Sequence, residues 1–92
     1  FARIKASKNG AIVRFTASWC KPCKQVAPFF NELSKQYKDV IFATVDVDEN
    51  SEIAADHGVI ALPAFHFYRD GEVLGTTKGS KEEAIQDLLD VY

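Results

Sequence analysis

Residues 19–23 spell WCKPC, a run that contains both cysteines of the chain. An apolar run rich in β-branched residues precedes it at 11–16, and an amphipathic pattern follows it at 22–37. The two cysteines are therefore predicted to lie where a buried strand turns into a helix. Pro22 suits an early helical position because it has no N–H to lose. Cys20 then lies at the helix N-terminus and Cys23 about one turn further on, which brings their sulfurs within bonding distance.

This spacing allows one disulfide to form and break. The free amides of a helix N-terminus and the positive end of its dipole stabilise a thiolate at Cys20, and Lys21 and Lys24 add positive charge nearby. Cys20 is therefore the predicted nucleophile in an exchange with another disulfide. Cys23 is predicted to resolve the mixed disulfide, because it is tethered beside the first sulfur. Trp19, next to a Cys20 expected to be exposed, is predicted to contact substrates and exclude water.

Further landmarks follow the motif in order along the chain. The helix continues as KQVAPF at 24–29, and later runs read VDVD at 45–48, LPA at 62–64 and FYRDG at 67–71, before a glycine at position 79. Together with residues 13–23, these runs resemble thioredoxins over nearly the whole chain. Thioredoxins usually carry glycine where this chain has Lys21, so the resemblance is to the family rather than to one member.

The resemblance implies an α/β thioredoxin fold with a central mixed sheet flanked by helices. Thioredoxins normally have another short strand before the first helix, and no sequence for it is present here, so a sheet of about four strands is expected. The implied activity is that of a protein-disulfide oxidoreductase working through Cys20 and Cys23. The implied partners are disulfide-containing proteins and a thioredoxin reductase or another dithiol that supplies electrons, with no bound cofactor and no metal.

The resemblance also implies which residues surround the sulfurs. Trp19, Lys21 and Pro22 are expected to shape the approach to the first sulfur. The peptide groove is expected to be lined by Ile60, Ala61, Leu62, Pro63 and Gly79. The peptide bond between Leu62 and Pro63 is expected to be cis, because thioredoxins hold the matching proline in that form.

Two departures from the family concern the proton chemistry of the second cysteine. Thioredoxins generally place a buried acid where this chain has Arg14, and many members place a lysine where it has Thr44. The usual proton relay is therefore absent. If Arg14 points beneath the disulfide, its charge favours thiolates and raises the redox potential above the roughly −270 mV typical of thioredoxin. A buried unpaired guanidinium is costly, so an acidic partner or a path to water is the alternative.

Other functional classes remain open from the residues alone. The missing acid is compatible with a specialised oxidase or isomerase, and a weakly redox-active domain that binds partners within a larger protein is the non-enzymatic alternative. A structural zinc site needs four ligands, whereas His57 and His66 lack metal-binding spacing to each other or to the cysteines. Asp46 and Asp48 are interpreted as solvated residues at a strand end rather than as catalytic carboxylates.

Composition agrees with a single folded domain over residues 1–92 that works as a monomer. The net charge of −2 gives no support for nucleic-acid binding. No apolar run approaches the roughly 20 residues of a membrane span.

The chain starts at Phe1 and contains no methionine, as a trimmed domain would. Because both cysteines belong to the motif, a cytoplasmic location is predicted, with an organelle as the alternative if a targeting segment precedes Phe1.

The pattern predicts how the first half of the chain folds. Residues 1–6 are typical of the end of an amphipathic helix, and Gly10 provides a left-handed stop after it. A buried central strand is predicted at 11–16 and a second buried parallel strand at 40–47.

The second half is predicted to contain a short helix and a hairpin. Asn50 is expected to cap a helix that stops at Gly58. Strands at 65–69 and 72–77 are expected to pair around a favoured two-residue turn at 70–71.

Two longer amphipathic helices complete the prediction. The motif helix at 22–37 is expected to kink at Pro28 and to bury Val26, Phe29, Phe30, Leu33 and Tyr37. Ser80 and Glu83 form a capping box for the last helix. The inward-facing residues of that helix are expected to be Ala84, Ile85, Leu88, Leu89 and Tyr92.

Overall fold

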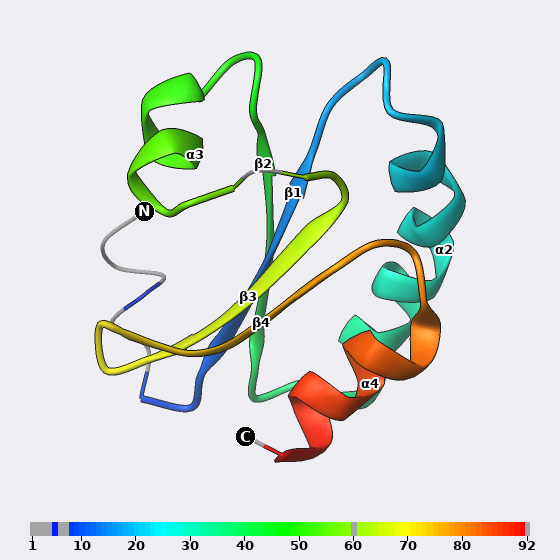
Figure 1. Cartoon of the computed structure of the whole chain (residues 1–92). Coiled ribbons are helices and arrows are strands. Elements are labelled where there is room, and N and C mark those ends of the chain that lie inside the picture. The colour runs from blue at the N-terminus through cyan, green and yellow to red at the C-terminus, as the bar shows by residue number, and fades with distance from the viewer. Residues whose placement is uncertain (1–4, 6–7, 60, 92) are drawn as a thin grey trace.

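A computed structural model describes residues 5, 8–59 and 61–91 of the chain. Its elements are β1 (Ala11–Thr16), α2 (Lys21–Gln36), β2 (Ile41–Asp46), α3 (Ser51–Asp56), β3 (Ala64–Arg69), β4 (Glu72–Lys78) and α4 (Glu82–Val91). The four strands form one sheet in the order β2-β1-β3-β4 (Figure 1). The predicted helix at residues 1–6 lies outside the described residues except for Lys5, which is helical.

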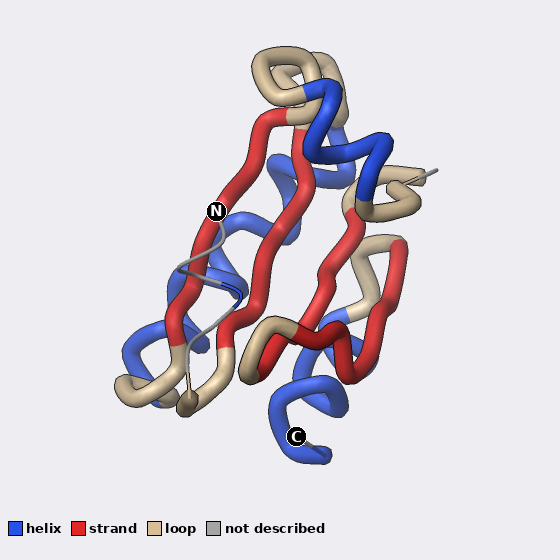
Figure 2. Tube along the Cα trace, turned by 90° about the vertical axis from the view of Figure 1, so that its left-hand side faces the viewer, coloured by secondary structure: helices blue, strands red, loops and turns tan. Residues whose placement is uncertain are grey.

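The sheet is parallel at one side and antiparallel at the other, as predicted. β1 runs parallel to β2, because α2 returns the chain from the C-terminal end of β1 to the end of the sheet at which β1 begins. β3 pairs antiparallel with both β1 and β4. In Figure 2 the strands, drawn in red, lie side by side in one sheet. β1 therefore lies in the middle of the sheet, and its C-terminal end leads directly to the cysteine motif.

The sequence prediction for β2 needs correction. A buried strand was expected at 40–47, but β2 lies at the edge of the described sheet, and Val45 is its buried residue. Ile41 is 40% exposed. Apolar content alone does not distinguish an edge strand from a central one, because each is apolar on the face that packs against a helix.

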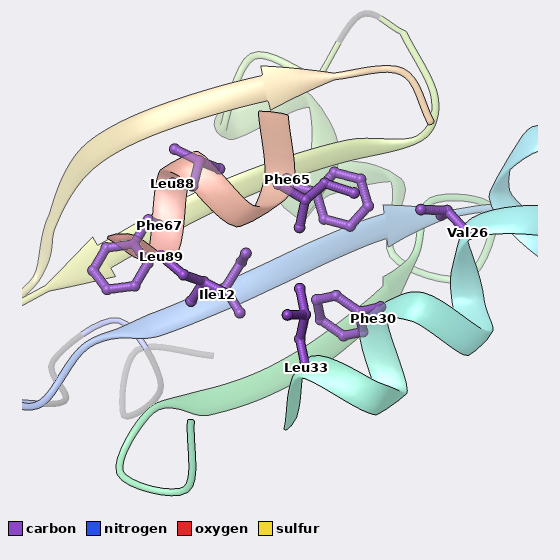
Figure 3. Packing of buried hydrophobic residues seen from close by; sticks show 9 residues of the cluster. Ile12, Val26, Phe30, Leu33, Phe65, Phe67, Leu88 and Leu89 are labelled. Carbon is purple, nitrogen blue, oxygen red and sulfur yellow. The ribbon is translucent and has the colours of Figure 1, made fainter. Parts of the chain in front are cut away.

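One apolar cluster fills the space between the sheet and the two longer helices. Val26, Phe30 and Leu33 of α2 are 2% exposed, and they pack with Ile12, Phe65 and Phe67 of the sheet and with Ile85, Leu88 and Leu89 of α4 (Figure 3). Phe29 and Tyr37 pack against the same cluster while partly exposed, so the predicted helix face is confirmed. Ala84 is half-buried, and Tyr92 lies outside the described residues.

α2 begins one residue earlier than predicted and ends one residue earlier. It includes Lys21, and Tyr37 is its C-cap. Pro28 lies inside the helix at an exposed position, and the helix continues through it to Gln36.

None of the described helices combines the length and the apolar character that crossing a bilayer requires.

α3 covers the opposite face of the sheet, where Ile53, Val59 and Leu62 pack against a second cluster formed by Val13, Phe15, Val45, Ala64 and Tyr68. The helix stops at Gly58 as predicted. Gly58 has a left-handed φ of +69°, its amide donates to Ala55, and the Val59 amide donates to Ala54. These two bonds satisfy carbonyls at the end of the helix.

The predicted side-chain cap of α3 is wrong. Asn50 occupies the N-cap position but makes no side-chain capping bond. Its side-chain amide instead donates to the Asp46 carbonyl at 3.1 Å. An asparagine side chain carries both a donor and an acceptor, and here the donor is satisfied by the end of β2.

The predicted hairpin is confirmed, whereas the last helix begins one residue later than a cap at Ser80 requires. Asp70 and Gly71 have φ of +53° and +85°, as a two-residue turn with both central residues left-handed requires. α4 begins at Glu82, so Lys81 rather than Ser80 precedes its first helical residue.

Candidate active site

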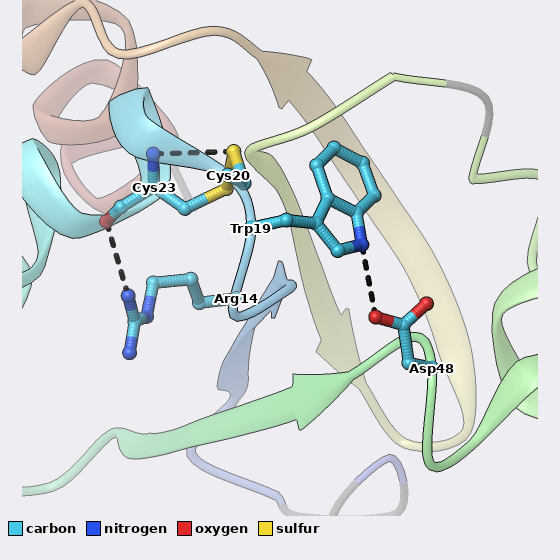
Figure 4. The surroundings of a disulfide bond; sticks show 5 residues. All are labelled: Arg14, Trp19, Cys20, Cys23 and Asp48. Carbon is cyan, nitrogen blue, oxygen red and sulfur yellow. Dashed lines mark hydrogen bonds between the residues drawn. A yellow bond between two sulfur atoms is a disulfide. The ribbon is translucent and has the colours of Figure 1, made fainter.

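The end of β1 and the start of α2 place the two cysteines side by side. After β1, the Cys20 amide donates to the Ala17 carbonyl at 3.1 Å and closes a tight turn. Cys20 is the N-cap of α2, and its sulfur accepts a hydrogen bond from the Cys23 amide at 3.3 Å. A disulfide joins the two cysteines, whose Cα atoms lie 5.3 Å apart (Figure 4).

The first turn of α2 favours negative charge at the Cys20 sulfur. Pro22 removes no hydrogen bond there, because the first amides of a helix have no intrahelical acceptor. The two charged residues of this turn are Lys21 and Lys24, and both are exposed. The amides, the helix dipole and these cations therefore act in the same direction and stabilise a thiolate at Cys20.

The two sulfurs are more buried than the sequence indicated. Cys20, expected to be exposed, is 4% exposed, and Cys23 is fully buried. The cysteines form a small cluster with Ala17, against which Val47 and Leu62 pack. These apolar neighbours come from loops that are distant in the sequence, which is why the motif alone did not predict the burial.

Trp19 extends beside the motif and is 69% exposed. Its indole Nε1 donates to a carboxylate oxygen of Asp48 at 2.9 Å (Figure 4). The residue pattern did not predict this contact and favoured a solvated Asp48 at the strand end. The parallel pairing of β1 and β2 is the signal that could have found it, because the C-terminal ends of parallel strands lie at the same edge of a sheet.

Asp46, the other aspartate of this strand end, organises the backbone there. Its carboxylate accepts the amides of Asp48 at 2.8 Å and of Glu49 at 3.4 Å. This local turn holds the Asp48 carboxylate within hydrogen-bond distance of the Trp19 indole.

A groove of about 580 Å³ opens beside the Cys20 sulfur, and it is lined by Trp19, Cys20, Lys21, Pro22, Val47, Ala54, Val59, Ala61 and Leu62. Ala61 and Leu62 were predicted from the resemblance, whereas Val47, Ala54 and Val59 were missed. Ile60 lies outside the described residues. Among the described residues that line the groove, Lys21 is the one with a charge, so the surface offered to a ligand is mostly apolar.

Pro63 and Gly79 are not among the described residues that line this groove. The Leu62–Pro63 peptide bond is cis, as predicted. Pro63 is buried, and its carbonyl accepts the Gly79 amide at 2.8 Å. Gly79 therefore ties the end of β4 to the loop that carries Ala61 and Leu62.

Arg14 lies on β1 beneath the first turn of α2 (Figure 4). Its Nη1 donates to the Cys23 carbonyl and its Nη2 to the Thr44 hydroxyl, each at 3.4 Å. The guanidinium carbon lies 5.4 Å from the centre of the Phe30 ring. Burial lowers the pKa of Arg14.

The two histidines lie on the other face of the sheet. His66 is buried, and its Nδ1 lies 3.0 Å from the Tyr68 hydroxyl. Burial, together with the nearby His57, lowers the pKa of His66, and burial raises the pKa of Tyr68 to about 12. His57 donates from Nδ1 to the Ile53 carbonyl at 2.8 Å.

Within residues 5, 8–59 and 61–91, no three His, Cys, Asp or Glu side chains gather as metal ligands.

Known proteins match both the sequence and the structure. A sequence model of the thioredoxin family matches residues 1–91. Thioredoxin 1 of Plasmodium falciparum is 38% identical over 92 residues, which is 100% of this chain and 88% of that protein. Mus musculus thioredoxin is 40% identical over 91 residues, covering 99% of this chain and 87% of that protein.

Solved structures give the same result. Oxidised mitochondrial thioredoxin 3 of Saccharomyces cerevisiae aligns with a TM-score of 0.95 at 32% identity, over 100% of this chain and 87% of that chain. The chain therefore belongs to the thioredoxin family and is a protein-disulfide oxidoreductase that works through Cys20 and Cys23.

Proposed function

We propose that Cys20 attacks substrate disulfides and that Cys23 resolves the resulting mixed disulfide. The observation that carries this assignment is the position of Cys20, which lines the 580 Å³ groove and whose sulfur caps α2. Cys23 is fully buried one turn behind it. A nucleophile must be both ionised and reachable, and Cys20 meets both conditions better than Cys23.

The exchange then proceeds in two steps. The Cys20 thiolate attacks one sulfur of the substrate, so that the substrate S–S bond breaks, a mixed disulfide forms and one substrate thiolate leaves. The Cys23 thiolate attacks the Cys20 sulfur, which closes the Cys20–Cys23 disulfide and releases the second substrate thiolate. The released thiolates take up the protons that the two cysteines gave up, and two electrons pass from the protein to the substrate.

The groove supports binding of an extended segment around the substrate cysteine. Trp19 and Pro22 form one part of the lining, and Ala61 and Leu62 form another part. The apolar residues between them favour an apolar side chain next to the reacting cystine, because that contact removes apolar surface from water. Pro63 and Gly79 support this surface, because the hydrogen bond between them holds the loop in place.

The partner classes follow from the family. Thioredoxins act on disulfide-containing proteins, use a redox-active disulfide and carry no prosthetic group. For this chain we propose a thioredoxin reductase or another dithiol as the electron donor. We also propose that it works as a monomer, and that it works in the cytoplasm, because both of its cysteines belong to the motif and none is left for a structural disulfide.

The test compares Cys20→Ser and Cys23→Ser with the native chain, using insulin as a protein disulfide and dithiothreitol as the reductant. Both variants are expected to lose turnover. For the trapping measurement each variant is reduced and the dithiothreitol is removed before insulin is added. The Cys23→Ser variant alone is then expected to accumulate a mixed disulfide, because its Cys20 attacks and no second thiol resolves the product. Mass spectrometry after acid quenching measures the adduct.

Two results would contradict the assignment. An adduct that forms with Cys20→Ser as fast as with Cys23→Ser would assign the attack to Cys23. A native chain that binds the oxidised substrate but does not reduce it would indicate a partner-binding domain instead of an enzyme.

A further inference from the structure

Arg14 is a half-buried cation, and its contacts within residues 8–59 and 61–91 are with neutral groups. Its partners are the Cys23 carbonyl, the Thr44 hydroxyl and the Phe30 ring. Its Nε is buried without a hydrogen-bond partner. Nη1 and Nη2 each donate at 3.4 Å, and the bond from Nη2 to Thr44 lies at an exposed position, whereas the buried Nε–H has lost its hydration without a replacement.

Among the described residues, the elements packed around Arg14 bring no carboxylate to it. On β2, the next residue on the same side after Thr44 is Asp46, whose carboxylate already accepts two backbone amides. On β3, Phe65 lies opposite Arg14 in register. α2 adds the exposed cation Lys24, and α4 packs through apolar side chains. Within residues 8–59 and 61–91, Arg14 therefore has no ion-pair partner.

A desolvated charge gains stability from any counter-ion that forms beside it. Burial lowers the pKa of Arg14, which reflects the cost of keeping the guanidinium charged in this position. In the disulfide form neither sulfur carries a charge. In the reduced form Cys23 is a thiol that can ionise, and Arg14 is hydrogen-bonded to the carbonyl of that same residue.

We propose that Arg14 is a positioning residue for the redox pair and that the Cys23 thiolate is the counter-ion it lacks in the disulfide form. The inference rests on the proposed function in one respect, because Cys20 and Cys23 must cycle between disulfide and dithiol. The charge of Arg14 stabilises the reduced form over the oxidised form. The protein is therefore a stronger oxidant than the same chain with a neutral residue at this position.

The equilibrium with glutathione isolates this effect from substrate binding. Two glutathione thiols reduce the pair: the Cys20–Cys23 bond breaks, one glutathione disulfide forms, and two electrons and two protons pass to the cysteines. When Cys23 stays ionised beside Arg14, its proton goes to the buffer. Stabilising that thiolate moves the equilibrium toward the dithiol.

The experiment measures this equilibrium at pH 7 for the native chain, Arg14→Gln, Arg14→Lys and Thr44→Val. Arg14→Gln removes the charge but keeps a donor for the Cys23 carbonyl, and it is expected to shift the equilibrium about tenfold toward the disulfide. For this two-electron couple, tenfold corresponds to about 30 mV. Arg14→Lys keeps the charge, and Thr44→Val keeps the guanidinium, so both are expected to stay within about twofold of the native value.

Salt separates Arg14 from the surface lysines. A Lys24→Gln substitution also removes a cation near the motif, but Lys24 is exposed. Its effect is expected to vanish in about 0.5 M salt, whereas the effect of Arg14→Gln persists, because partly buried charges are screened less. If the effect of Arg14→Gln disappears in salt as well, the counter-ion model is wrong.

A second readout follows the thiol itself. In a Cys20→Ser background, Cys23 is expected to ionise at lower pH when Arg14 is present than when Arg14→Gln is added, as measured by thiolate ultraviolet absorbance. Equal ionisation in the two proteins, or a redox equilibrium unchanged by Arg14→Gln, would overturn the inference while leaving the proposed function intact. A pair that does not exchange with glutathione at all would overturn both.

Discussion

The Trp19 indole is a large exposed ring held by one side-chain hydrogen bond. Asp48 accepts that bond at 2.9 Å, and both residues lie at the surface beside the groove. Because the ring is 69% exposed, little packing fixes its orientation. The bond to Asp48 is therefore the main contact that holds the ring against the groove.

Asp48→Ala is expected to lower kcat/KM for insulin reduction about fivefold, because a hydrogen bond of this kind is worth roughly 1 kcal/mol. Asp48→Asn keeps an acceptor oxygen and is expected to recover most of the loss. The measurement is the initial rate against substrate concentration. If Asn is as impaired as Ala, the charge of Asp48, and not its hydrogen bond, matters for the rate.

His66 makes the stability of the fold depend on pH. Its pKa is lowered by burial and by the nearby His57, so the unfolded chain takes up a proton at a higher pH than the folded chain does. The neutral side chain is favoured in the fold. Its contribution to stability is therefore fully present above the unfolded pKa of about 6.5 and is lost as the pH falls below it.

The free energy of unfolding is expected to decrease between pH 7 and pH 5, and His66→Gln is expected to reduce that decrease. Glutamine can still bond the Tyr68 hydroxyl but does not titrate. Urea denaturation at several pH values measures the slope. An equally steep slope in the variant would assign the effect to other groups.

At the scale of the elements, α2 is the helix that supports both the core and the motif. Leu33 is 2% exposed in the cluster between α2, the sheet and α4. Leu33→Ala is expected to lower the free energy of unfolding by about 2–5 kcal/mol through lost burial and a residual cavity. Val91→Ala is the control, because Val91 also lies on a helix but is 70% exposed, and its cost is expected to be within about 0.5 kcal/mol. Chemical denaturation compares the two, and equal losses would contradict the assigned packing.

The connection into β1 depends on a glycine for two separate reasons. Gly10 has a left-handed φ of +96°, and a Cβ there would lie 2.5 Å from the Phe67 ring. Gly58 also has a left-handed φ, +69°, but a Cβ there would meet no atom within 4 Å. The two positions therefore separate the cost of backbone conformation from the cost of a clash.

Gly58→Ala is expected to cost about 1–2 kcal/mol of stability through its φ alone. Gly10→Ala is expected to cost about 1–3 kcal/mol more than that, because Phe67 is buried and cannot move without repacking. Thermal or urea unfolding of both variants measures the difference. Equal losses would show that the Phe67 ring yields without cost.

At the scale of the whole molecule, the groove is a mostly apolar surface, and Lys21 is the charged residue among the described residues that line it. Lys21 lies at the start of α2, whereas Lys8 is an exposed lysine before β1, at the other end of that strand. The position of Lys21 predicts faster reduction of peptides with an acidic residue beside the cystine than of matched peptides with lysine there.

Lys21→Gln is expected to remove most of that preference, and Lys8→Gln is expected to leave it unchanged. The preference of the native chain is expected to weaken in about 0.5 M salt, since exposed charges are screened. The ratio of kcat/KM for the two peptides is the measurement. A preference that survives Lys21→Gln would place its origin elsewhere on the surface.

The sequence by itself determined the features that depend on neighbouring residues. The WCKPC spacing predicted a disulfide at a helix N-terminus, and the structure has Cys20 as the N-cap of α2. The turn at Asp70 and Gly71 and the stop at Gly58 were predicted as well. Capping, turn conformation and helix periodicity involve residues a few positions apart, so they can be read locally.

Only the tertiary structure decided which distant segments meet at the sulfurs. Asp48 contacts Trp19, and Thr44 contacts Arg14, because β2 lies beside β1. Arg14 and Thr44, for example, are 30 residues apart in the sequence. The edge position of β2 and the groove residues Val47 and Ala54 also depend on that pairing. Contacts of this kind are set by how strands order in the sheet and by which faces the helices cover, and no local pattern of residue types contains that information.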